Sequence, residues 1–167
     1  SYESPIETIE TNVLGTSNLL DAARKLTKLK SILIITTDKC YENKEWAWGY
    51  REGDQLGGHD IYSSSKACTE LITTSFARSF FNKPTSPRIA TARAGNVIGG
   101  GDWAKDRLVP DIIKGLKSTG VHLRSPYSVR PWQHVLEPLN GYLSLIIALL
   151  NDTERKYEGA WNFGPDD

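Results

Sequence analysis

Two long segments of the chain repeat apolar residues at the spacing of an α-helix. The first follows Ser4 and Pro5, a pair typical of helix starts, and its pattern continues to about residue 28. The second covers residues 61–81. Spacing of this kind predicts that each helix packs along one side. The apolar positions are Ile9, Val13, Leu14, Leu19, Leu20, Ala23 and Leu26 in the first helix, and Ala67, Leu71, Ile72, Phe76 and Phe80 in the second.

Two short runs, "SILIITT" (31–37) and "RIATARAGNVIG" (88–99), show no alternation of apolar and polar positions. Such runs are typical of parallel strands that helices cover on both faces. The chain continues with a helix over 106–118, short strands near 121–124 and 132–136, a helix over 138–150 and a last strand in "GAWNFG". Alternating helices and strands predict an α/β domain with a largely parallel sheet.

The candidate chemistry gathers where these strands end. Residues 41–60 form a long segment rich in glycine, tryptophan and charge, and long loops inside compact domains are usually functional. In parallel sheets, sites lie beyond the carboxyl ends of the strands. We therefore expect one cleft to collect polar residues from both strand ends and from the second helix: Thr37, Asp38, Lys39, Tyr62, Lys66 and Asn96.

Composition excludes several classes of protein. The 167 residues carry a formal net charge of zero, so no long-range field attracts nucleic acid or an anionic membrane. No apolar run reaches the roughly 18 residues of a transmembrane helix, and residues 1–30 lack a signal-peptide layout. Cys40 and Cys68 are too few for a disulfide scaffold and lack metal-ligand spacing. We expect a soluble, cytoplasmic protein without a metal site.

Tyr62 and Lys66 lie one helical turn apart in "YSSSK". A free phenol has a pKa of about 10 and is a poor base at neutral pH. An ammonium on the same helix face can lower that pKa by about one to three units. Such a tyrosine could accept a hydroxyl proton while hydride leaves the carbon, with Thr37 orienting the hydroxyl. By spacing alone, an exposed helix with two ordinary polar residues is the simpler interpretation.

Three stretches together resemble the extended short-chain dehydrogenase/reductase family: "ETNVLGTSNLLDAAR", "IYSSSKACTE" and "RIATARAGNVIG". The resemblance covers nearly the whole chain. It implies a Rossmann-like, doubly wound parallel sheet, present in part, with part of a smaller substrate-binding region. Within the family, the chain is most similar to dehydratases that act on CDP-glucose, through "TTDKCYENKEWAWGYREGDQLGGHDIYSSSKA" (36–67) and "RPWQHVLEPLNGYL" (130–143).

The resemblance implies a redox-neutral dehydration with NAD as the cofactor. Hydride leaves C4 of the glucose, water is lost across C5 and C6 of the resulting ketone, and the hydride returns to C6. Tyr62 is implied as the base at O4, Lys66 as its pKa tuner and a ribose contact, and Thr37 as the hydrogen-bond partner of O4. Asp38 is implied as the acid that protonates the leaving C6 hydroxyl, which requires a raised pKa. Lys39 stands where related dehydratases keep a glutamate base, and a lysine is a base only when neutral.

The substrate contacts are carried over from the same resemblance. A nucleotide diphosphate is negatively charged, and arginine binds such groups in a bidentate manner. Arg130 and Asn96 match the family's residues at the diphosphate. Taken singly, each arginine could instead be a solvated surface residue, and the tryptophan could equally belong to the core. The full set implied for the substrate is Asn96, Arg107, Leu108, Val109, Arg130 and Trp103.

The family's glycine-rich dinucleotide turn does not occur in this sequence, since "GNVIGGGDW" follows the wrong strand. We therefore expect residues 1–98 to be the C-terminal part of an NAD-binding Rossmann domain. Residues 99–167 are expected to contain both substrate-binding segments and segments that return to the Rossmann domain. We also expect the chain to be truncated at both ends. Such a chain should bind NAD poorly by itself. The NAD contacts implied within it are Tyr62, Lys66 and Asn12.

The expected partners are a nucleotide sugar, CDP-glucose or a similar compound, and a second copy of the chain. The helices predicted over 5–28 and 61–81 carry apolar faces broader than one core requires, and in the family the corresponding helices form a dimeric four-helix bundle. No nucleic acid or membrane is expected as a partner.

Two alternative functions remain open. A nucleotide-sugar 4-epimerase shares Tyr62 and Lys66 but needs no acid–base pair for loss of water, so Asp38 beside Lys39 argues against it. A non-catalytic NAD-binding scaffold would keep the fold without turnover, and the intact set of Thr37, Tyr62 and Lys66 argues weakly against that.

Overall fold

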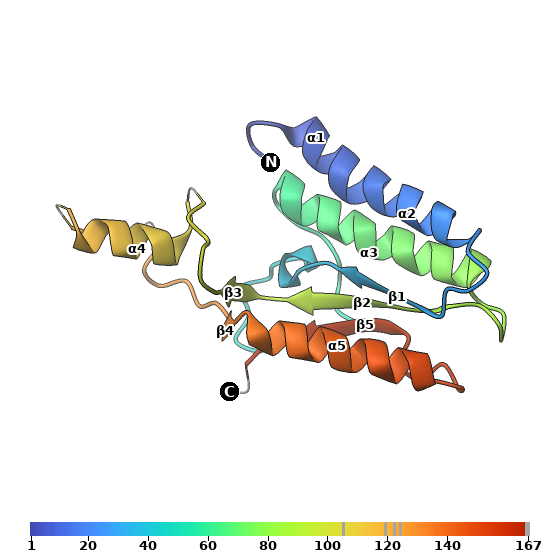
Figure 1. Ribbon diagram of the computed structural model, residues 1–167. Coiled ribbons are helices and arrows are strands. Elements are labelled where there is room, and N and C mark those ends of the chain that lie inside the picture. Colours follow the sequence, from blue (N-terminus) through green and yellow to red (C-terminus); the bar gives the residue numbers. More distant parts are fainter. Residues whose placement is uncertain (105, 119, 122, 124, 166–167) are drawn as a thin grey trace.

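A three-stranded parallel sheet forms the centre of the computed structural model, which describes residues 1–104, 106–118, 120–121, 123 and 125–165. The strands are β1 (Ser31–Ile35), β2 (Arg88–Ala94) and β5 (Gly159–Phe163), in the order β1-β2-β5 (Figure 1). Both strand pairs are parallel, which confirms the predicted α/β class.

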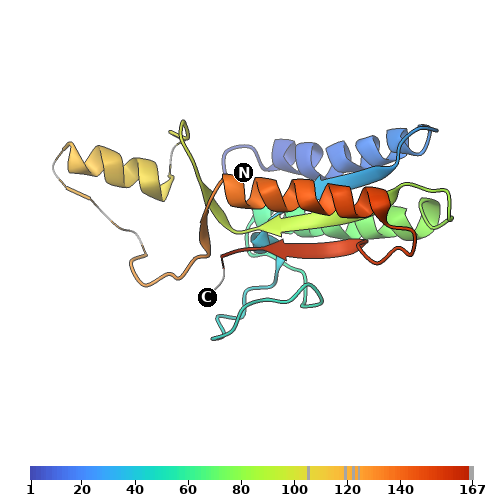
Figure 2. The same cartoon turned by 60° about the horizontal axis from the view of Figure 1, so that its bottom comes forward.

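Helices cover both faces of this sheet, as in a doubly wound fold (Figures 1 and 2). One face carries α1 (Pro5–Ile9), the π-helical turn η1 (Glu10–Leu14), α2 (Gly15–Ala23) and α3 (Ile61–Phe80), and the other carries α5 (Leu136–Asn151). Buried apolar side chains fill both layers. They are Leu20, Ala23, Ile32, Phe81 and Ile89 on the first face, and Ala90, Leu145 and Leu149 on the second.

The first helical segment is shorter and less regular than the helix predicted over 5–28. It ends at Ala23, where the backbone tightens into a turn that leads to β1. Within η1, the carbonyl oxygen of Asn12 accepts hydrogen bonds from the hydroxyls of Thr16 (2.7 Å) and Thr69 (3.0 Å). Two side-chain hydroxyls therefore bond a backbone carbonyl oxygen of η1, where the α-helical hydrogen-bond pattern is interrupted.

The second predicted strand, over 88–99, is divided in two at Gly95. After β2, the chain forms β3 (Asn96–Ile98), which pairs with β4 (Trp132–His134) in a separate two-stranded sheet. A Cβ atom at Gly95 would lie 2.4 Å from Cγ of Pro131. The missing side chain therefore permits the close approach at which the chain leaves the main sheet.

The remaining elements follow the predicted order with different limits. Helix α4 (Leu108–Leu116) lies within the helix predicted over 106–118 and stands apart from the sheet (Figures 1 and 2). The strand predicted near 121–124 lies partly outside the described residues, and residues 121 and 123 belong to no strand. Among the helices that are described, none has both the length and the apolar character needed to cross a membrane.

Candidate active site

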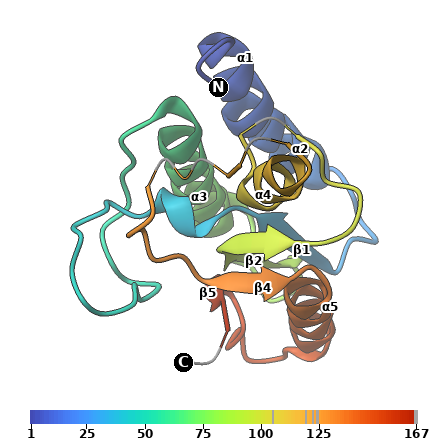
Figure 3. The same cartoon turned by 90° about the vertical axis from the view of Figure 1, so that its left-hand side faces the viewer.

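Thr37 and Asp38 follow β1 at the carboxyl end of the sheet, which faces the viewer in Figure 3. Thr37 is buried and caps the 3-10 turn η2 (Asp38–Cys40), since its hydroxyl oxygen accepts a hydrogen bond from the amide of Lys39 over 3.4 Å. The same hydroxyl donates to Oδ1 of Asp38 over 3.1 Å. The strand end therefore presents a hydroxyl and a carboxylate side by side.

Tyr62 enters the same space from the first turn of α3. This helix begins after Asp60, whose carboxylate accepts hydrogen bonds from the amide (3.1 Å) and the hydroxyl (2.8 Å) of Ser63. Burial raises the pKa of Tyr62 above its ordinary value. Hydrogen bonding with the Thr37 side chain and the positive charge of Arg107 both oppose this rise, while two nearby carboxylates add to it.

Lys66 lies on the same face of α3 as Tyr62, as predicted. Its Nζ is 6.0 Å from the centre of the Tyr62 ring and donates a hydrogen bond to the carbonyl oxygen of Ile35 over 3.3 Å. Burial lowers the pKa of Lys66, and the Glu70 carboxylate opposes that shift. The pKa of the phenol is raised, against the lowering predicted from Lys66. Burial is the largest influence on the pKa of Tyr62, and the charge of Arg107 is among those that oppose it.

Asp38 and Lys39 lie between the end of β2 and the start of α3. A Cβ atom at Gly95 would lie 3.3 Å from Oδ2 of Asp38, so the carboxylate is directly against the β2–β3 junction. Lys39 is exposed. Although burial acts to raise the pKa of Asp60, hydrogen bonds from Ser63 and the charge of Lys39 hold it below its usual range. The charge of Lys39 therefore reaches the N-terminus of the tyrosine helix.

Asn12, the predicted cofactor-side asparagine, connects η1 to α3. Its Nδ2 donates to Oγ of Ser65 over 2.9 Å, and its carbonyl oxygen accepts from Thr69. Ser65 in turn donates to the carbonyl oxygen of Tyr62 over 2.7 Å. Asn12 therefore stabilises the helical turn that carries the tyrosine.

Two of the predicted substrate residues, Asn96 and Arg130, belong to the second sheet or lie just before it. Asn96 is paired across β3 and β4 with Trp132, and the exposed Arg130 lies just before β4. Oδ1 of Asn96 is buried and has no hydrogen-bond partner in the described part of the chain. A buried polar atom without a partner is costly, which is the condition expected of a group that a ligand completes.

The other predicted substrate residues belong to the segment around α4. Arg107 precedes this helix and forms an exposed ion pair with Asp102 over 3.7 Å, while its charge also reaches the phenol at the strand ends. Leu108 and Val109 begin the helix, and Trp103 is 57% exposed. The charge of Arg107 therefore acts on Tyr62 at the carboxyl end of the sheet. The three apolar residues belong to the segment around α4, which stands apart from the sheet (Figure 2).

Sequence reasoning missed a buried ion pair beside this site, formed by Glu70 of α3 and Arg93 of β2. Their side chains are 2% and 4% exposed, and Nη2 of Arg93 lies 2.9 Å from Oε2 of Glu70. Arginine and glutamate are almost never fully buried unless paired. Two signals were present: an arginine in the interior of a strand predicted to be buried, and a glutamate one turn beyond Lys66 on the same helix.

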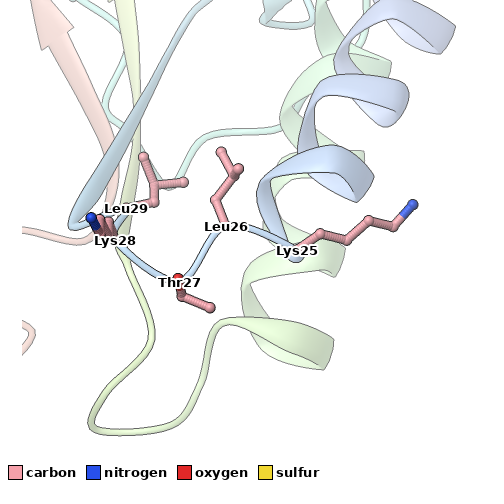
Figure 4. Close-up of a pocket in the computed structure, with 5 residues that line it drawn as sticks. All are labelled: Lys25, Leu26, Thr27, Lys28 and Leu29. Atoms are coloured by element: carbon pink, nitrogen blue, oxygen red, sulfur yellow. The ribbon is translucent and has the colours of Figure 1, made fainter.

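Two surface hollows lie at the opposite end of the sheet. One is lined by residues 25–29, which connect α2 to β1 (Figure 4). The other lies beside it, at the ends of α2 and α3. Neither contains any of the predicted site residues, so neither belongs to the candidate active site.

Comparison with known proteins relates the chain to nucleotide-sugar enzymes. Residues 1–145 match the family described as GDP-mannose 4,6 dehydratase. The chain is 52% identical over 172 residues to the CDP-glucose 4,6-dehydratase of Salmonella typhimurium, an alignment that covers 100% of this chain and 48% of that protein. The chain thus spans about half the length of this relative.

Solved structures show the same fold. A dTDP-glucose 4,6-dehydratase from Streptomyces venezuelae with NAD and TYD bound superposes with a TM-score of 0.81 at 21% identity, over 100% of this chain and 48% of that chain. A UDP-glucuronic acid 4-epimerase from Bacillus cereus, in complex with UDP-glucuronic acid and NAD, gives 0.76 at 19% identity, over 95% and 47%. The predicted Rossmann-like fold is confirmed, and it is common to dehydratases and epimerases.

Proposed function

The chain belongs to the GDP-mannose 4,6 dehydratase family, and on this premise we propose that it is the catalytic part of an NAD-dependent nucleotide-sugar 4,6-dehydratase. The proposed reaction converts CDP-glucose to CDP-4-keto-6-deoxyglucose, which makes the enzyme a hydro-lyase. The observation that carries this proposal is the 52% identity to a CDP-glucose 4,6-dehydratase over the whole chain. The gathering of Thr37, Asp38 and Tyr62 at one end of the sheet supports it.

The residues at this end suit the nicotinamide ribose of NAD. Within the described residues, Lys66 gives one hydrogen bond to the Ile35 carbonyl, and an ammonium has three donors, so donors remain for ribose hydroxyls. Tyr62 lies on the same helix face. Asn12 contributes indirectly, by stabilising the turn of α3 beneath the tyrosine. NAD, when bound, would supply the acceptor of the C4 hydride and the donor that returns it to C6.

Tyr62 is proposed to accept the proton of the sugar O4 as the C4–H bond breaks. Thr37 reaches the phenol and can hydrogen-bond the same sugar hydroxyl, which orients it for proton transfer. Because burial raises the pKa of Tyr62, neighbouring cations have to offset that rise for a phenolate to form at moderate pH. Arg107 contributes to this in the structure.

Asp38 and Lys39 are proposed to handle the loss of water. Once C4 is a ketone, the C5 proton is acidic; its removal and the departure of the C6 hydroxyl form the C5–C6 double bond. Asp38 would protonate the leaving hydroxyl, so that water is released, and Lys39 in its neutral form would take the C5 proton. Asp38 lies beside Thr37, and Lys39 is exposed.

The nucleotide is proposed to bind across the second sheet and the α4 segment. The unpaired Oδ1 of Asn96, which is opposite Trp132 in the strand pairing, and the exposed Arg130 two residues before Trp132 are proposed to bind one ligand. Arg107 would add charge for the diphosphate. Leu108, Val109 and Trp103 would contact the base.

The larger organisation is proposed on the same premise. Residues 1–98 would form the C-terminal part of the NAD-binding domain, and residues 99–167 would mix substrate-binding and returning segments. A homodimer through α1, α2 and α3 is supported by their exposed apolar side chains, among them Leu19 and Leu71 at 54% and 59% exposure. A cytoplasmic location and a role in deoxysugar biosynthesis, such as that of lipopolysaccharide O-antigen, remain predictions.

The direct test is to incubate the complete protein that carries this chain with CDP-glucose and catalytic amounts of NAD, and to identify the sugar by NMR. When the reaction is run in D2O, we expect a 4-keto-6-deoxyhexose that carries deuterium at C5. A C4 epimer that keeps its C6 hydroxyl would select the epimerase instead. Unchanged CDP-glucose, with NAD bound, would select the non-catalytic scaffold.

A further inference from the structure

A single buried ion pair holds both ends of the segment that carries the proposed catalytic residues. The carboxylate of Glu70 accepts a hydrogen bond from the hydroxyl of Thr36, directly before Thr37. The guanidinium of Arg93 donates from Nη1 to the hydroxyl of Tyr41, directly after η2, over 2.8 Å. Thr36 and Tyr41 are called the two anchors below. The segment between the anchors consists of Thr37 and η2. Hydrogen bonds from the anchors to this ion pair connect the segment to β2 and to α3.

The pair is rigid because its polar atoms are occupied. Arg93 bonds Glu70 in a bidentate manner, with Nε to Oε1 at 3.0 Å and Nη2 to Oε2 at 2.9 Å. Oε2 also accepts from the hydroxyl of Thr91 over 2.7 Å, and Nη1 of Arg93 also donates to the carbonyl oxygen of Glu52 over 3.0 Å. A buried network in which each member is satisfied favours one arrangement over its alternatives.

The Tyr41 anchor extends this network into the long loop at 41–60. Its hydroxyl donates to Oδ1 of Asn162 over 2.6 Å, and Nδ2 of Asn162 donates to the carbonyl oxygen of Tyr50 over 2.9 Å. The rings of Tyr41 and Tyr50 are stacked with their centres 5.0 Å apart. The loop is therefore attached to β5, and the C-terminal anchor cannot move without it.

We propose that Glu70 and Arg93 are positioning residues for the reaction, which touch neither substrate nor cofactor. Glu70 lies on the helix of Tyr62, and the pair bonds both ends of the segment that holds Thr37 and Asp38, so it sets how the tyrosine and the carboxylate face each other. The reaction needs both groups on one sugar ring, Tyr62 at O4 and Asp38 at the C6 hydroxyl. This inference rests on the proposed function.

The test is Arg93→Lys in the complete protein that carries this chain. A lysine keeps the charge opposite Glu70 but lacks the planar fork that reaches Tyr41 at the same time. A displacement of about 1 Å costs on the order of 100-fold in rate, so we expect kcat to fall by about 10- to 100-fold while KM for CDP-glucose changes little. Hydrogen–deuterium exchange of the amides of 38–41 should become faster.

Two further variants separate positioning from stability. Tyr41→Phe removes only the hydroxyl of one anchor and keeps the stacked ring, so it should show a smaller loss of kcat and faster exchange at 38–41 even if Arg93→Lys folds poorly. Arg155→Lys is the matched control. Arg155 also forms a short, partly buried ion pair, 2.7 Å from Glu158, but its other bonds go to the carbonyl oxygens of Phe81 and Lys83, near the opposite end of the sheet. The Arg155→Lys variant should leave both kcat and the exchange rates of the amides of 38–41 unchanged.

Several results would overturn the proposal. They are an unchanged kcat in Arg93→Lys and Tyr41→Phe, a fall in kcat without faster exchange at 38–41, or an equal fall in Arg155→Lys. If the wild-type protein does not convert CDP-glucose, the proposed function fails by itself. The exchange rates of the variants then still decide whether the ion pair holds the segment in place.

Discussion

The ammonium of Lys66 lies 6.0 Å from the centre of the Tyr62 ring and gives its hydrogen bond to the carbonyl oxygen of Ile35. The lysine therefore lies over the ring and bonds the end of β1. Burial raises the pKa of the phenol, and the groups that oppose this rise, Thr37 and Arg107, come from outside α3. The strength of Tyr62 as a base thus depends on how β1 and the segment before α4 are placed against the helix.

Tyr62→Phe should abolish turnover and leave the fold intact. The substitution removes the hydroxyl that is proposed to take the O4 proton but keeps the half-buried ring. General acid–base groups contribute about 100- to 10,000-fold, so kcat should fall by at least about 100-fold. The measurement is ketone formation from CDP-glucose, with circular dichroism to check the fold. Tyr127→Phe is the control, because Tyr127 is 96% exposed and should tolerate the change. Full activity in Tyr62→Phe would remove the tyrosine from the mechanism.

Thr37→Val should shift the pH dependence of the enzyme toward alkaline pH. Tyr62 acts as a base only when deprotonated, so kcat/KM rises with pH until the pH passes the pKa of the phenol. The Thr37 side chain lowers that pKa, and its removal leaves the effect of burial less opposed. The rising limb of the pH profile should therefore move to higher pH. Thr27→Val, an exposed change at the other end of β1, should leave the profile in place.

The periodicity of apolar residues was sufficient to predict the main layers of the fold. It located α3 to within a residue at its end and the strands to within a few residues, because burial on one face imposes a period that local sequence carries. It did not reveal η1, since a π-helical turn keeps apolar residues such as Val13 and Leu14 at nearly helical spacing. Nor did it reveal the break at Gly95, because residues 88–99 show no change of pattern there that would separate two strands.

The site was predicted in part. Thr37, Asp38 and Tyr62 meet as expected, because the carboxyl ends of parallel strands share one edge of the sheet. The direction of the pKa shift at Tyr62 was wrong, since the sequence shows neighbours along a helix but not how deeply a ring is buried. The contact of Glu70 with Arg93 could not be read locally either, because it joins two elements that are far apart in the chain.

Leu71→Glu should convert a dimer of the complete protein into monomers. Leu71 is 59% exposed on the outer face of α3, and a carboxylate placed inside an apolar interface loses its hydration without gaining a partner. The measurement is molar mass by light scattering during size-exclusion chromatography. Leu116→Glu is the control, because Leu116 is 76% exposed at the end of α4, outside the proposed interface. A dimer that persists in Leu71→Glu would argue for a different interface.

Gly95→Ala should reduce activity by moving the substrate-binding strands relative to Asp38. The added Cβ would lie 2.4 Å from Cγ and 3.0 Å from the carbonyl oxygen of Pro131, and 3.3 Å from Oδ2 of Asp38. A proline ring and a backbone carbonyl cannot swing aside, so the β2–β3 junction itself must shift. We expect both a higher KM and a kcat lower by about 10-fold or more, since displacements of about 1 Å are costly. Gly100→Ala is the matched control, because its Cβ would meet no atom within 4 Å. Equal kinetics in the two variants would show that the close approach at Gly95 does not place the carboxylate.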